Sequence, residues 1–359
     1  MEPQPQPRVL FIADAGPKVG GGHLMRCLTL AAALAQRGAA CAFVDHPGAA
    51  AMLDAFAEPR MTRLAVGELD VHAARQVAAD WAADAVVVDH YGVACAQEQA
   101  LQAPGRLMAV IDDLADRPHD CDLLLDPGLG RDASSYAGLI PTRATALTGP
   151  DYALVRPEFA ALRPASLERR RQGAPVQRLL IALGLTDLEA ITARVVEAVI
   201  PVADGLELDV VVGRGAASLP ALAALSGDNP RLQVYVETTG MGALMAAADL
   251  AVGAGGSSTW ERACLGLPSL NLVLADNQRG LAVELERRGA SVLLEASNSR
   301  LGERLRAEVA ALRVDGSRRE ALSEASARLC DGRGAERAAE ALLGRIGGLD
   351  LEAGGGKAP

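Results

Sequence analysis

Short runs of hydrophobic residues alternate along the chain with longer segments in which apolar residues recur at helical spacing. The short runs predict strands, and the longer segments predict helices. In the first half, the predicted strands are 9–12, 40–44, 85–89, 107–111 and 123–125, and a helix over 23–37 follows the first of them. This alternation is typical of a parallel, doubly wound sheet covered by helices.

The pattern is interrupted over 156–177, where three prolines and three consecutive arginines predict a linker between domains. Beyond it, strands are predicted at 178–183, 208–212, 232–236, 250–252, 269–274 and 291–294, and helices at 191–200, 259–265 and 302–345. We therefore expect two Rossmann-like domains of the α/β class, over 8–155 and 178–346, with a disordered tail over 347–359. Ligands bind at the carboxyl ends of such sheets, so the domains are expected to face a central cleft.

Composition narrows the classes of protein that fit this pattern. The chain has 359 residues, enough for two domains, and a net charge of −10, which argues against nucleic acid held on a basic face. Its apolar runs are too short for a signal peptide or a membrane span, so we expect a cytoplasmic protein without a membrane partner. Six scattered cysteines show no C-x-x-C spacing. We expect no metal, no cofactor and a monomer.

A glycine-rich loop joins the first predicted strand to the first helix. Asp14 follows the strand, and Gly21 and Gly22 directly precede His23 at the start of the helix. Glycines let a ligand approach the backbone closely, and the helix dipole favours a neutral imidazole, which suits a general base. The alternative is a histidine that caps the helix. The spacing differs from the dinucleotide and P-loop patterns, which argues against an NAD-dependent dehydrogenase.

Further polar residues follow two other predicted strands of this half. Asp89 ends the predicted strand over 85–89, and Tyr91 follows it closely. Asp89 would orient a base, and Tyr91 would contact a sugar. The alternative is a turn in which Asp89 caps the next helix. Asp112, Asp113 and Asp116 follow the strand over 107–111. Crowded carboxylates occur in metal sites and equally in turns, and we expect no metal here.

The segment over 253–278 carries the strongest signal for a nucleotide. Glycines end a predicted strand, and hydroxyl residues open the next helix, where free backbone N–H groups bind phosphate; the alternative role of these hydroxyls is helix capping. A carboxylate one turn later suits the ribose hydroxyls. The predicted UDP-binding residues are Gly255, Gly256, Ser257, Ser258 and Glu261. Asn277 and Gln278 follow the next strand and are predicted to contact the diphosphate or the sugar.

Five motifs carry a resemblance to a known family. They are A-D-A-x-x-x-x-G-x-G-H-x-M-R-C-L-T-L-A over 13–31, V-V-D-H-Y over 87–91, R-P-H-D-C-D-L-L-L-D over 117–126, G-P-x-Y-A-L-x-R-P-E-F over 149–159 and G-S-S-T-W-E-R over 256–262. The last resembles the nucleotide-sugar site of glycosyltransferase-B-type enzymes. Together, in this order, the motifs resemble the UDP-2,4-diacetamido-2,4,6-trideoxy-β-L-altropyranose hydrolases of pseudaminic acid biosynthesis.

The resemblance implies a glycosyltransferase-B fold and metal-independent attack of water on the anomeric carbon of a UDP-sugar. His23 would be the general base, Tyr91 a sugar contact, and Glu261 the ribose ligand. The released sugar would supply synthesis of a nonulosonic acid for flagellin or surface glycans. The chain departs from the family pattern at Ile12, where the family has arginine, and at Leu185, where it has glycine. A related di-N-acetylated UDP-sugar is therefore an alternative substrate.

Two other functions stay open at this point. In a glycosyltransferase that uses a UDP-sugar donor, His23 would activate an acceptor hydroxyl instead of water. A lipid or glycan acceptor calls for an apolar or basic surface, for which the first half gives no clear signal. In a non-catalytic nucleotide-sugar-binding protein, the changes at Ile12 and Leu185 would have removed activity. Measured turnover separates this third function from both enzymes.

Overall fold

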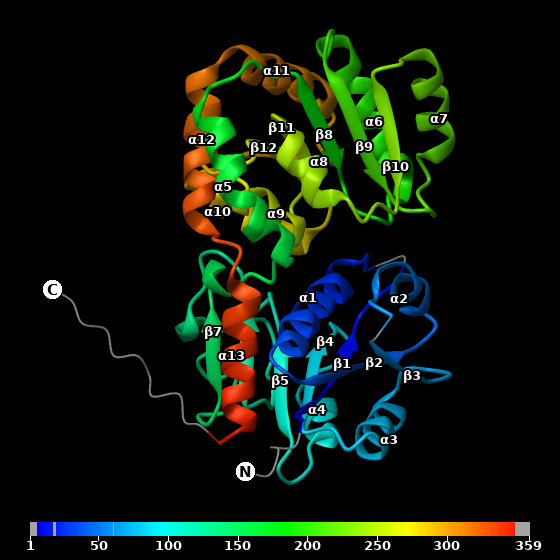
Figure 1. The fold of residues 1–359 in the computed structure, drawn as a ribbon, viewed down its shortest axis with the longest axis vertical. Helices are drawn as coiled ribbons and strands as arrows, with labels where there is room; N and C mark the ends of the chain where they lie inside the picture. Colours follow the sequence, from blue (N-terminus) through cyan, green and yellow to red (C-terminus); the bar gives the residue numbers. More distant parts are fainter. Residues whose placement is uncertain (1–5, 17–18, 60, 349–359) are drawn as a thin grey trace, which may run out of the picture. The chain divides into compact units, whose positions relative to one another are not determined.

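The computed structural model describes residues 6–16, 19–59 and 61–348, so most of the tail predicted over 347–359 lies outside the described residues. The chain divides into two compact units, each built around one parallel sheet (Figure 1). Among the described residues, the first unit contains 6–15, 23–154 and 334–348, and the second contains 16, 19–22 and 155–333. The predicted class, α/β with two Rossmann-like domains, is confirmed.

The first unit has a seven-stranded parallel sheet in the order β3-β2-β1-β4-β5-β6-β7. Its strands are β1 (Arg8–Ala13), β2 (Ala40–Asp45), β3 (Thr62–Ala65), β4 (Ala85–Asp89), β5 (Leu107–Ile111), β6 (Leu123–Asp126) and β7 (Thr145–Thr148). The helices are α1 (Gly22–Gln36), α2 (Ala50–Phe56), α3 (Val71–Asp80), α4 (Cys95–Leu101) and, from the far end of the chain, α13 (Gly334–Ile346).

The second unit has a six-stranded parallel sheet in the order β10-β9-β8-β11-β12-β13. Its strands are β8 (Arg178–Ala182), β9 (Glu207–Val212), β10 (Leu232–Val236), β11 (Leu250–Ala254), β12 (Ser269–Val273) and β13 (Val292–Glu295). Its helices are α5 (Pro157–Arg171), α6 (Ile191–Val199), α7 (Leu219–Asp228), α8 (Met241–Ala247), α9 (Ser258–Cys264), α10 (Asp276–Arg287), α11 (Leu301–Val314) and α12 (Gly316–Leu329).

The central strands of both sheets are buried on both faces, which is why they read as continuous apolar runs. In each sheet the strand order reverses between the two central strands, β1 beside β4 and β8 beside β11. Ligands of open α/β sheets bind at this switch point, just beyond the carboxyl ends of the strands. The residues that follow these strands are therefore the first place to look for a site.

Two predicted boundaries are wrong. The segment predicted as a linker over 156–177 contains a helix of fifteen residues, α5, because Pro157 occupies the first turn, where proline is tolerated. The helix α13 belongs to the first unit, although 178–346 was predicted as one domain. Its apolar face, which includes Ala338, Ala339 and Leu342, completes the core under α1 and β5.

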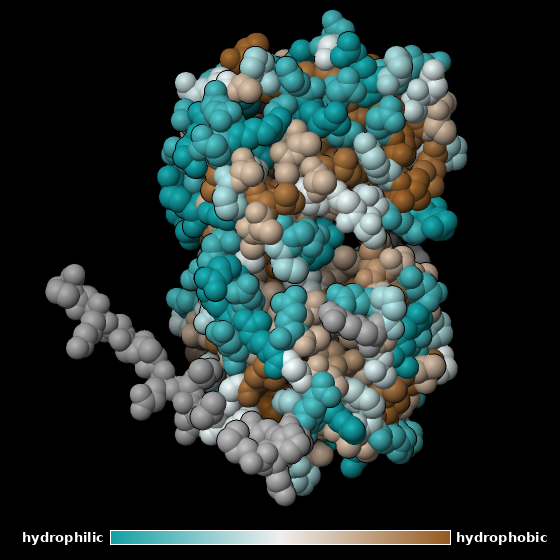
Figure 2. Space-filling view, viewed as in Figure 1, coloured by the Kyte–Doolittle hydropathy of each residue, from teal (hydrophilic) through white to brown (hydrophobic). Residues whose placement is uncertain are grey.

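The surface and the helices carry less information about function. Polar and apolar residues are mixed over the face of each unit that Figure 2 shows, so hydrophobic surface does not single out a site there. No helix within residues 6–16, 19–59 and 61–348 combines the length and the apolar character that crossing a membrane requires. The site is therefore built from the polar groups at the ends of the strands.

Candidate active site

A histidine and an aspartate form a buried pair in the first unit. His23 lies in the first turn of α1, and Asp89 is the last residue of β4. Nδ1 of His23 lies 2.5 Å from Oδ1 of Asp89, and both side chains are almost fully buried. Because an ionised carboxylate only accepts hydrogen bonds, Nδ1 is the donor, and in the neutral imidazole Nε2 is the nitrogen with a lone pair. The pair thus has the form that orients a histidine general base.

The guanidinium of Arg26 keeps Asp89 ionised. Its Nε donates to Oδ2 of Asp89 at 2.6 Å, and its Nη2 donates to Oδ1 at 2.7 Å. Burial raises the pKa of Asp89, but the charges of Arg26 and His23 outweigh burial and hold this pKa well below its ordinary range. The bidentate geometry is the strong form of an arginine–carboxylate pair. Asp89 therefore stays charged and able to accept from His23 at any moderate pH.

Asp113 and Tyr91 extend this group. Nη1 of Arg26 donates to Oδ2 of Asp113 at 2.7 Å, and the hydroxyl of Tyr91 donates to Oδ1 of Asp113 at 2.9 Å. The ring of Tyr91 meets the His23 imidazole edge to face, with centroids 4.5 Å apart. Two residues predicted independently for the site, His23 and Tyr91, are thus in direct contact. Asp113 joins the same group through Arg26.

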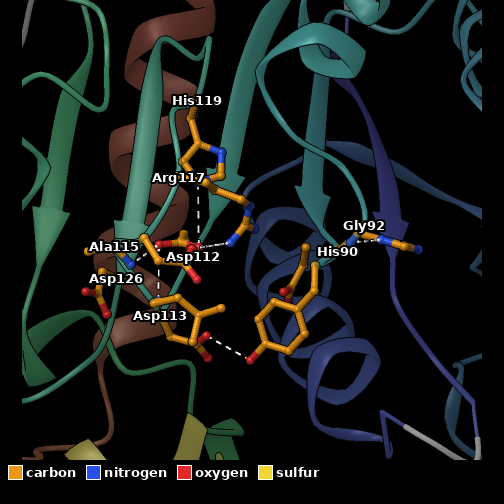
Figure 3. A network of polar contacts seen from close by, with 12 residues as sticks. His90, Gly92, Asp112, Asp113, Ala115, Arg117, His119 and Asp126 are labelled. Atoms are coloured by element: carbon orange, nitrogen blue, oxygen red, sulfur yellow. Dashed lines mark hydrogen bonds and ion pairs between the residues drawn. The ribbon is translucent and has the colours of Figure 1, made fainter.

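Asp14 and His90 lie beside the pair. The backbone N–H of Asp14 donates to the carbonyl of Asp89 at 2.7 Å, and Oδ1 of Asp14 is 3.8 Å from Nε2 of His90. His90 accepts from the N–H of Gly92 at Nδ1, so Nε2 carries its proton (Figure 3). Burial lowers the pKa of His90. The alternative in which Asp89 caps the next helix is wrong, since α4 begins after Ala94.

A second acidic group supports the fold. Asp112 accepts from the N–H of Ala115 and from the hydroxyl of Tyr136, and it lies beside Arg117 and His119 (Figure 3). The third aspartate of this stretch is exposed and pairs with Arg117. The three aspartates therefore have different partners, although they are close in sequence. Across the described part of the chain, no group of three or more His, Cys, Asp or Glu side chains is placed to hold a metal ion.

In the second unit, Arg262 anchors the glycine loop from inside. This buried guanidinium donates to the carbonyl of Ala254 at 2.8 Å and to the hydroxyl of Ser258 at 3.0 Å. Burial lowers its pKa to about 10. A Cβ at Gly253 would lie 2.3 Å from Nη1 of Arg262, so only glycine fits there. The loop is thereby held at both of its ends.

The held loop presents backbone donors. Within residues 6–16, 19–59 and 61–348, no acceptor is recorded for the N–H groups of Gly256 and Ser257. Ser257 occupies the N-cap position of α9, but its side chain makes no capping bond, so the capping role is wrong for this residue. Thr259 bonds back to the carbonyl of Ala254 instead. Unpaired N–H groups at a helix start are a general anion-binding arrangement.

The remaining residues predicted for UDP lie around this loop. Glu261 is on the first turn of α9. Its Oε1 accepts from Nε of Arg156 at 2.9 Å and lies 2.9 Å from Nη2 in an ion pair. Asn277 and Gln278 are on the first turn of α10. Oε1 of Gln278 accepts from the N–H of Leu274 at 3.1 Å, and a Cβ at Gly255 would come within 3.2 Å of the Gln278 side chain.

Comparison with known proteins identifies part of the chain. Residues 188–341 match the glycosyltransferase family 28 C-terminal domain, so the loop, Glu261, Asn277 and Gln278 all fall inside this match. The matched residues make up most of the second unit and the beginning of α13.

Two curated proteins are similar in sequence. UDP-2,4-diacetamido-2,4,6-trideoxy-beta-L-altropyranose hydrolase of Campylobacter jejuni is 26% identical over 191 residues, which cover 52% of this chain and 64% of that protein. Spore coat polysaccharide biosynthesis protein SpsG of Bacillus subtilis is 30% identical over 146 residues, which cover 40% of this chain and 42% of that protein. The chain thus matches less than two thirds of either relative. The first similarity confirms the family resemblance carried by the motifs.

Solved structures extend the likeness beyond residues 188–341 to nearly the whole chain. MurG of Acinetobacter baumannii is 17% identical, covers 96% of this chain and all of its own, and has a TM-score of 0.62. The calicheamicin glycosyltransferase CalG4 is 17% identical at 97% coverage of this chain and 100% of its own, with a TM-score of 0.63. At such identities the likeness shows the fold alone, and the predicted glycosyltransferase-B type is confirmed.

Three arginines that contact residues of the candidate site were not among the predicted site residues. Arg262 and Arg156 contact the loop and Glu261, and Arg26 contacts Asp89. All three arginines lie in the motifs over 13–31, 149–159 and 256–262, but none was assigned a role there. Arg26 had a second signal, because residues three apart lie on one face of a helix, which places it beside His23.

Proposed function

We propose that the protein hydrolyses a UDP-activated 2,4-diacetamido-2,4,6-trideoxyhexose to UDP and the free sugar. The observation that carries this proposal is the pairing of His23 with Asp89, which leaves Nε2 of the imidazole as a proton acceptor. The named activity of the Campylobacter relative supports the choice of substrate. The match of residues 188–341 to the family 28 domain supports a nucleotide sugar as the ligand class.

In the proposed reaction, Nε2 of His23 accepts a proton from water as the water oxygen forms a bond to the anomeric carbon. The bond between that carbon and the diphosphate oxygen breaks, and its electron pair leaves with UDP. The imidazole becomes an imidazolium, which the ionised Asp89 stabilises through Nδ1. Arg26 contributes by keeping that carboxylate charged in a buried setting.

The UDP group is assigned to the second unit. The free N–H groups of Gly256 and Ser257, with Gly255 and the Ser258 hydroxyl nearby, suit a diphosphate. Glu261 suits the ribose, because a carboxylate accepts from two neighbouring hydroxyls. Asn277 and Gln278 in the second unit, and Tyr91, Asp14, Gly21 and Gly22 near His23, are proposed as contacts to the sugar or the diphosphate.

The test is incubation of the purified protein with UDP-2,4-diacetamido-2,4,6-trideoxy-β-L-altropyranose, followed by NMR of the sugar and phosphorus resonances. We expect release of UDP and free sugar by the wild type, and loss of at least about a hundredfold of the rate in His23→Ala. UDP affinity of the variant, measured by calorimetry, should stay at the wild-type value and so show that the nucleotide site is intact.

Tight UDP binding without any release of sugar would overturn hydrolysis of this substrate. Release that begins only when an acceptor alcohol is added would instead indicate a glycosyltransferase. Release from a related di-N-acetylated UDP-sugar would keep the reaction and change the substrate, as the departures at Ile12 and Leu185 allow. Expected partners are otherwise limited to this small molecule.

A further inference from the structure

An arginine outside every predicted site holds the carboxylate assigned to the ribose. Arg156 directly precedes α5. Its Nε donates to Oε1 of Glu261 at 2.9 Å, and its Nη2 forms an ion pair with the same oxygen at 2.9 Å. The side chains are 20% and 14% exposed, so the pair is sheltered but still reachable by a ligand. Both residues belong to the second unit. The question is what this pair does for the nucleotide.

Arg156 is itself held in place by its surroundings. Its guanidinium carbon lies 5.0 Å from the ring centroid of Phe159, a fully buried residue of α5. Its Nη1 lies 3.3 Å from Oε1 of Glu158. Burial lowers the pKa of Arg156, but the two glutamates outweigh burial and raise it. A planar guanidinium fixed on one ring and two carboxylates can keep Glu261 in one orientation.

Arg156 contacts one of the two carboxylate oxygens of Glu261. The hydrogen bond from Nε and the ion pair with Nη2 both involve Oε1, and among the described residues no hydrogen bond reaches Oε2. A vicinal diol offers two hydroxyl donors, so an oriented Oε2 is suited to recognise a ribose. The positive charge of Arg156 also compensates the negative charge of Glu261. Without it, this carboxylate would repel a diphosphate bound to the neighbouring loop.

We infer that Arg156 is a positioning residue that makes Glu261 selective for a ribonucleotide, resting on the proposed assignment of UDP to this loop. Arg156 acts through Glu261 and need not touch the ligand. This selectivity is for the 2′-hydroxyl of the ribose. The affinity for UDP alone does not measure the selectivity, whereas a comparison with 2′-deoxy-UDP does. Loss of Arg156 should weaken the binding of UDP more than the binding of 2′-deoxy-UDP.

The experiment compares the dissociation constants of UDP and 2′-deoxy-UDP by calorimetry on the full chain. We expect the wild type to prefer UDP by about tenfold or more, the typical effect of one hydrogen bond to a charged group. Arg156→Met should reduce this preference to about twofold, and Arg156→Lys, which keeps the charge but loses the fork, should recover only part of it. Glu261→Gln should also reduce the preference, and adding Arg156→Met to it should change nothing further.

Arg169→Met is the matched control, because Arg169 lies at the other end of α5 and pairs with Asp249. Its preference for UDP should equal that of the wild type. If Arg156 had only a structural role, Arg156→Met would weaken the binding of UDP and of 2′-deoxy-UDP equally. The preference for UDP would then be unchanged, and the inference would be overturned. Absence of UDP binding by the wild type would overturn the nucleotide assignment together with the inference. UDP binding without any preference over 2′-deoxy-UDP would overturn the inference alone.

Discussion

Nδ1 of His23 lies 2.5 Å from Oδ1 of Asp89, and the same carboxylate receives two N–H groups of Arg26. One aspartate therefore fixes the tautomer of the histidine while an arginine fixes the charge of the aspartate. In the proposed proton transfer, Asp89 therefore acts on His23 directly, and Arg26 acts on His23 only through Asp89. This dependence also allows each contribution to be removed by itself.

Asp89→Asn should abolish most of the activity without disturbing UDP binding. An amide presents either a carbonyl or an NH₂ group to Nδ1, and Arg26 claims the carbonyl, so the imidazole would be driven toward the wrong tautomer. We expect kcat to fall by about 10²- to 10⁴-fold. The UDP dissociation constant should be unchanged, because Asp89 and the loop assigned to UDP belong to different units. Steady-state kinetics and calorimetry measure the two quantities.

Asp113→Asn serves as the comparison, because Asp113 contacts Arg26 and Tyr91 and leaves the His23–Asp89 pair in place. Its kcat should fall by less than about tenfold. If Asp89→Asn kept the wild-type rate, the pair would have no part in proton transfer. Equal losses in the two variants would assign the effect to the Arg26 network as a whole.

Arg26→Met should cost the protein more stability than the loss of an exposed pair. Two carboxylates, of Asp89 and Asp113, would lose their common counter-charge, and one of them is fully buried. Removing one partner of a buried pair costs about 3–5 kcal/mol of unfolding free energy. The control is Arg63→Met, since Arg63 also bridges two carboxylates, of Asp45 and Asp54, but at the surface. It should cost about 1 kcal/mol or less.

Urea unfolding of both variants measures this difference. Part of the loss in Arg26→Met should be regained as the pH falls, because protonating the stranded carboxylates removes their buried charge. The Arg63→Met variant should show no such recovery. Equal losses in the two variants would mean that Asp89 finds another counter-charge, and His23 would be the first residue to examine.

Two glycines of the second unit should respond differently to alanine. At Gly253 a Cβ would meet Nη1 of Arg262 at 2.3 Å, so Gly253→Ala should cost about 1–3 kcal/mol by overpacking. At Gly256 a Cβ meets nothing within 4 Å. Gly256→Ala should therefore keep the wild-type melting temperature and lose UDP affinity, because the methyl group stands where a diphosphate must approach. Unaltered UDP affinity in Gly256→Ala would move the diphosphate away from this loop.

The sheets could be predicted because their central strands are buried on both faces. Strands β4 and β5, which are buried along their whole length, have the predicted bounds. The edge strands β3 and β7 were missed, since their residues are mostly partly or fully exposed and show no continuous apolar run. The prolines and arginines of α5 indicated a linker, yet Arg169 and Arg170 donate to carbonyls at the end of α8. A sequence does not reveal such distant acceptors.

The site was predicted only in part for a related reason. His23, Asp89 and Tyr91 each follow a glycine loop or a strand, and the sheet topology then brings them together. The counter-charges come from elsewhere: Arg26, one helical turn after His23, binds Asp89, and Arg156, from a different segment of the chain, binds Glu261. Strand ends can be read from one sequence. Counter-charges depend on packing, which one sequence does not specify.

His119 should make the stability of the first unit depend on alkaline pH. Burial lowers the pKa of His119, but Asp112 and Glu98 outweigh burial and raise it to about 9. The unfolded value is roughly 6.5, so this contribution is fully present below pH 6.5 and is lost as the pH rises through 9. A rise in pKa of this size amounts to on the order of 3 kcal/mol.

The measurement is urea unfolding of the wild type and of His119→Gln between pH 6 and pH 10. Glutamine is neutral at every pH, so the difference between the two proteins isolates the imidazolium. We expect the wild type to be the more stable protein at pH 6 and its advantage to shrink by a few kcal/mol by pH 10. A constant difference would mean that His119 is neutral throughout. In that case Nδ1 would still donate to Glu98, but Asp112 would depend on Arg117 and on the N–H of Ala115 for its charge.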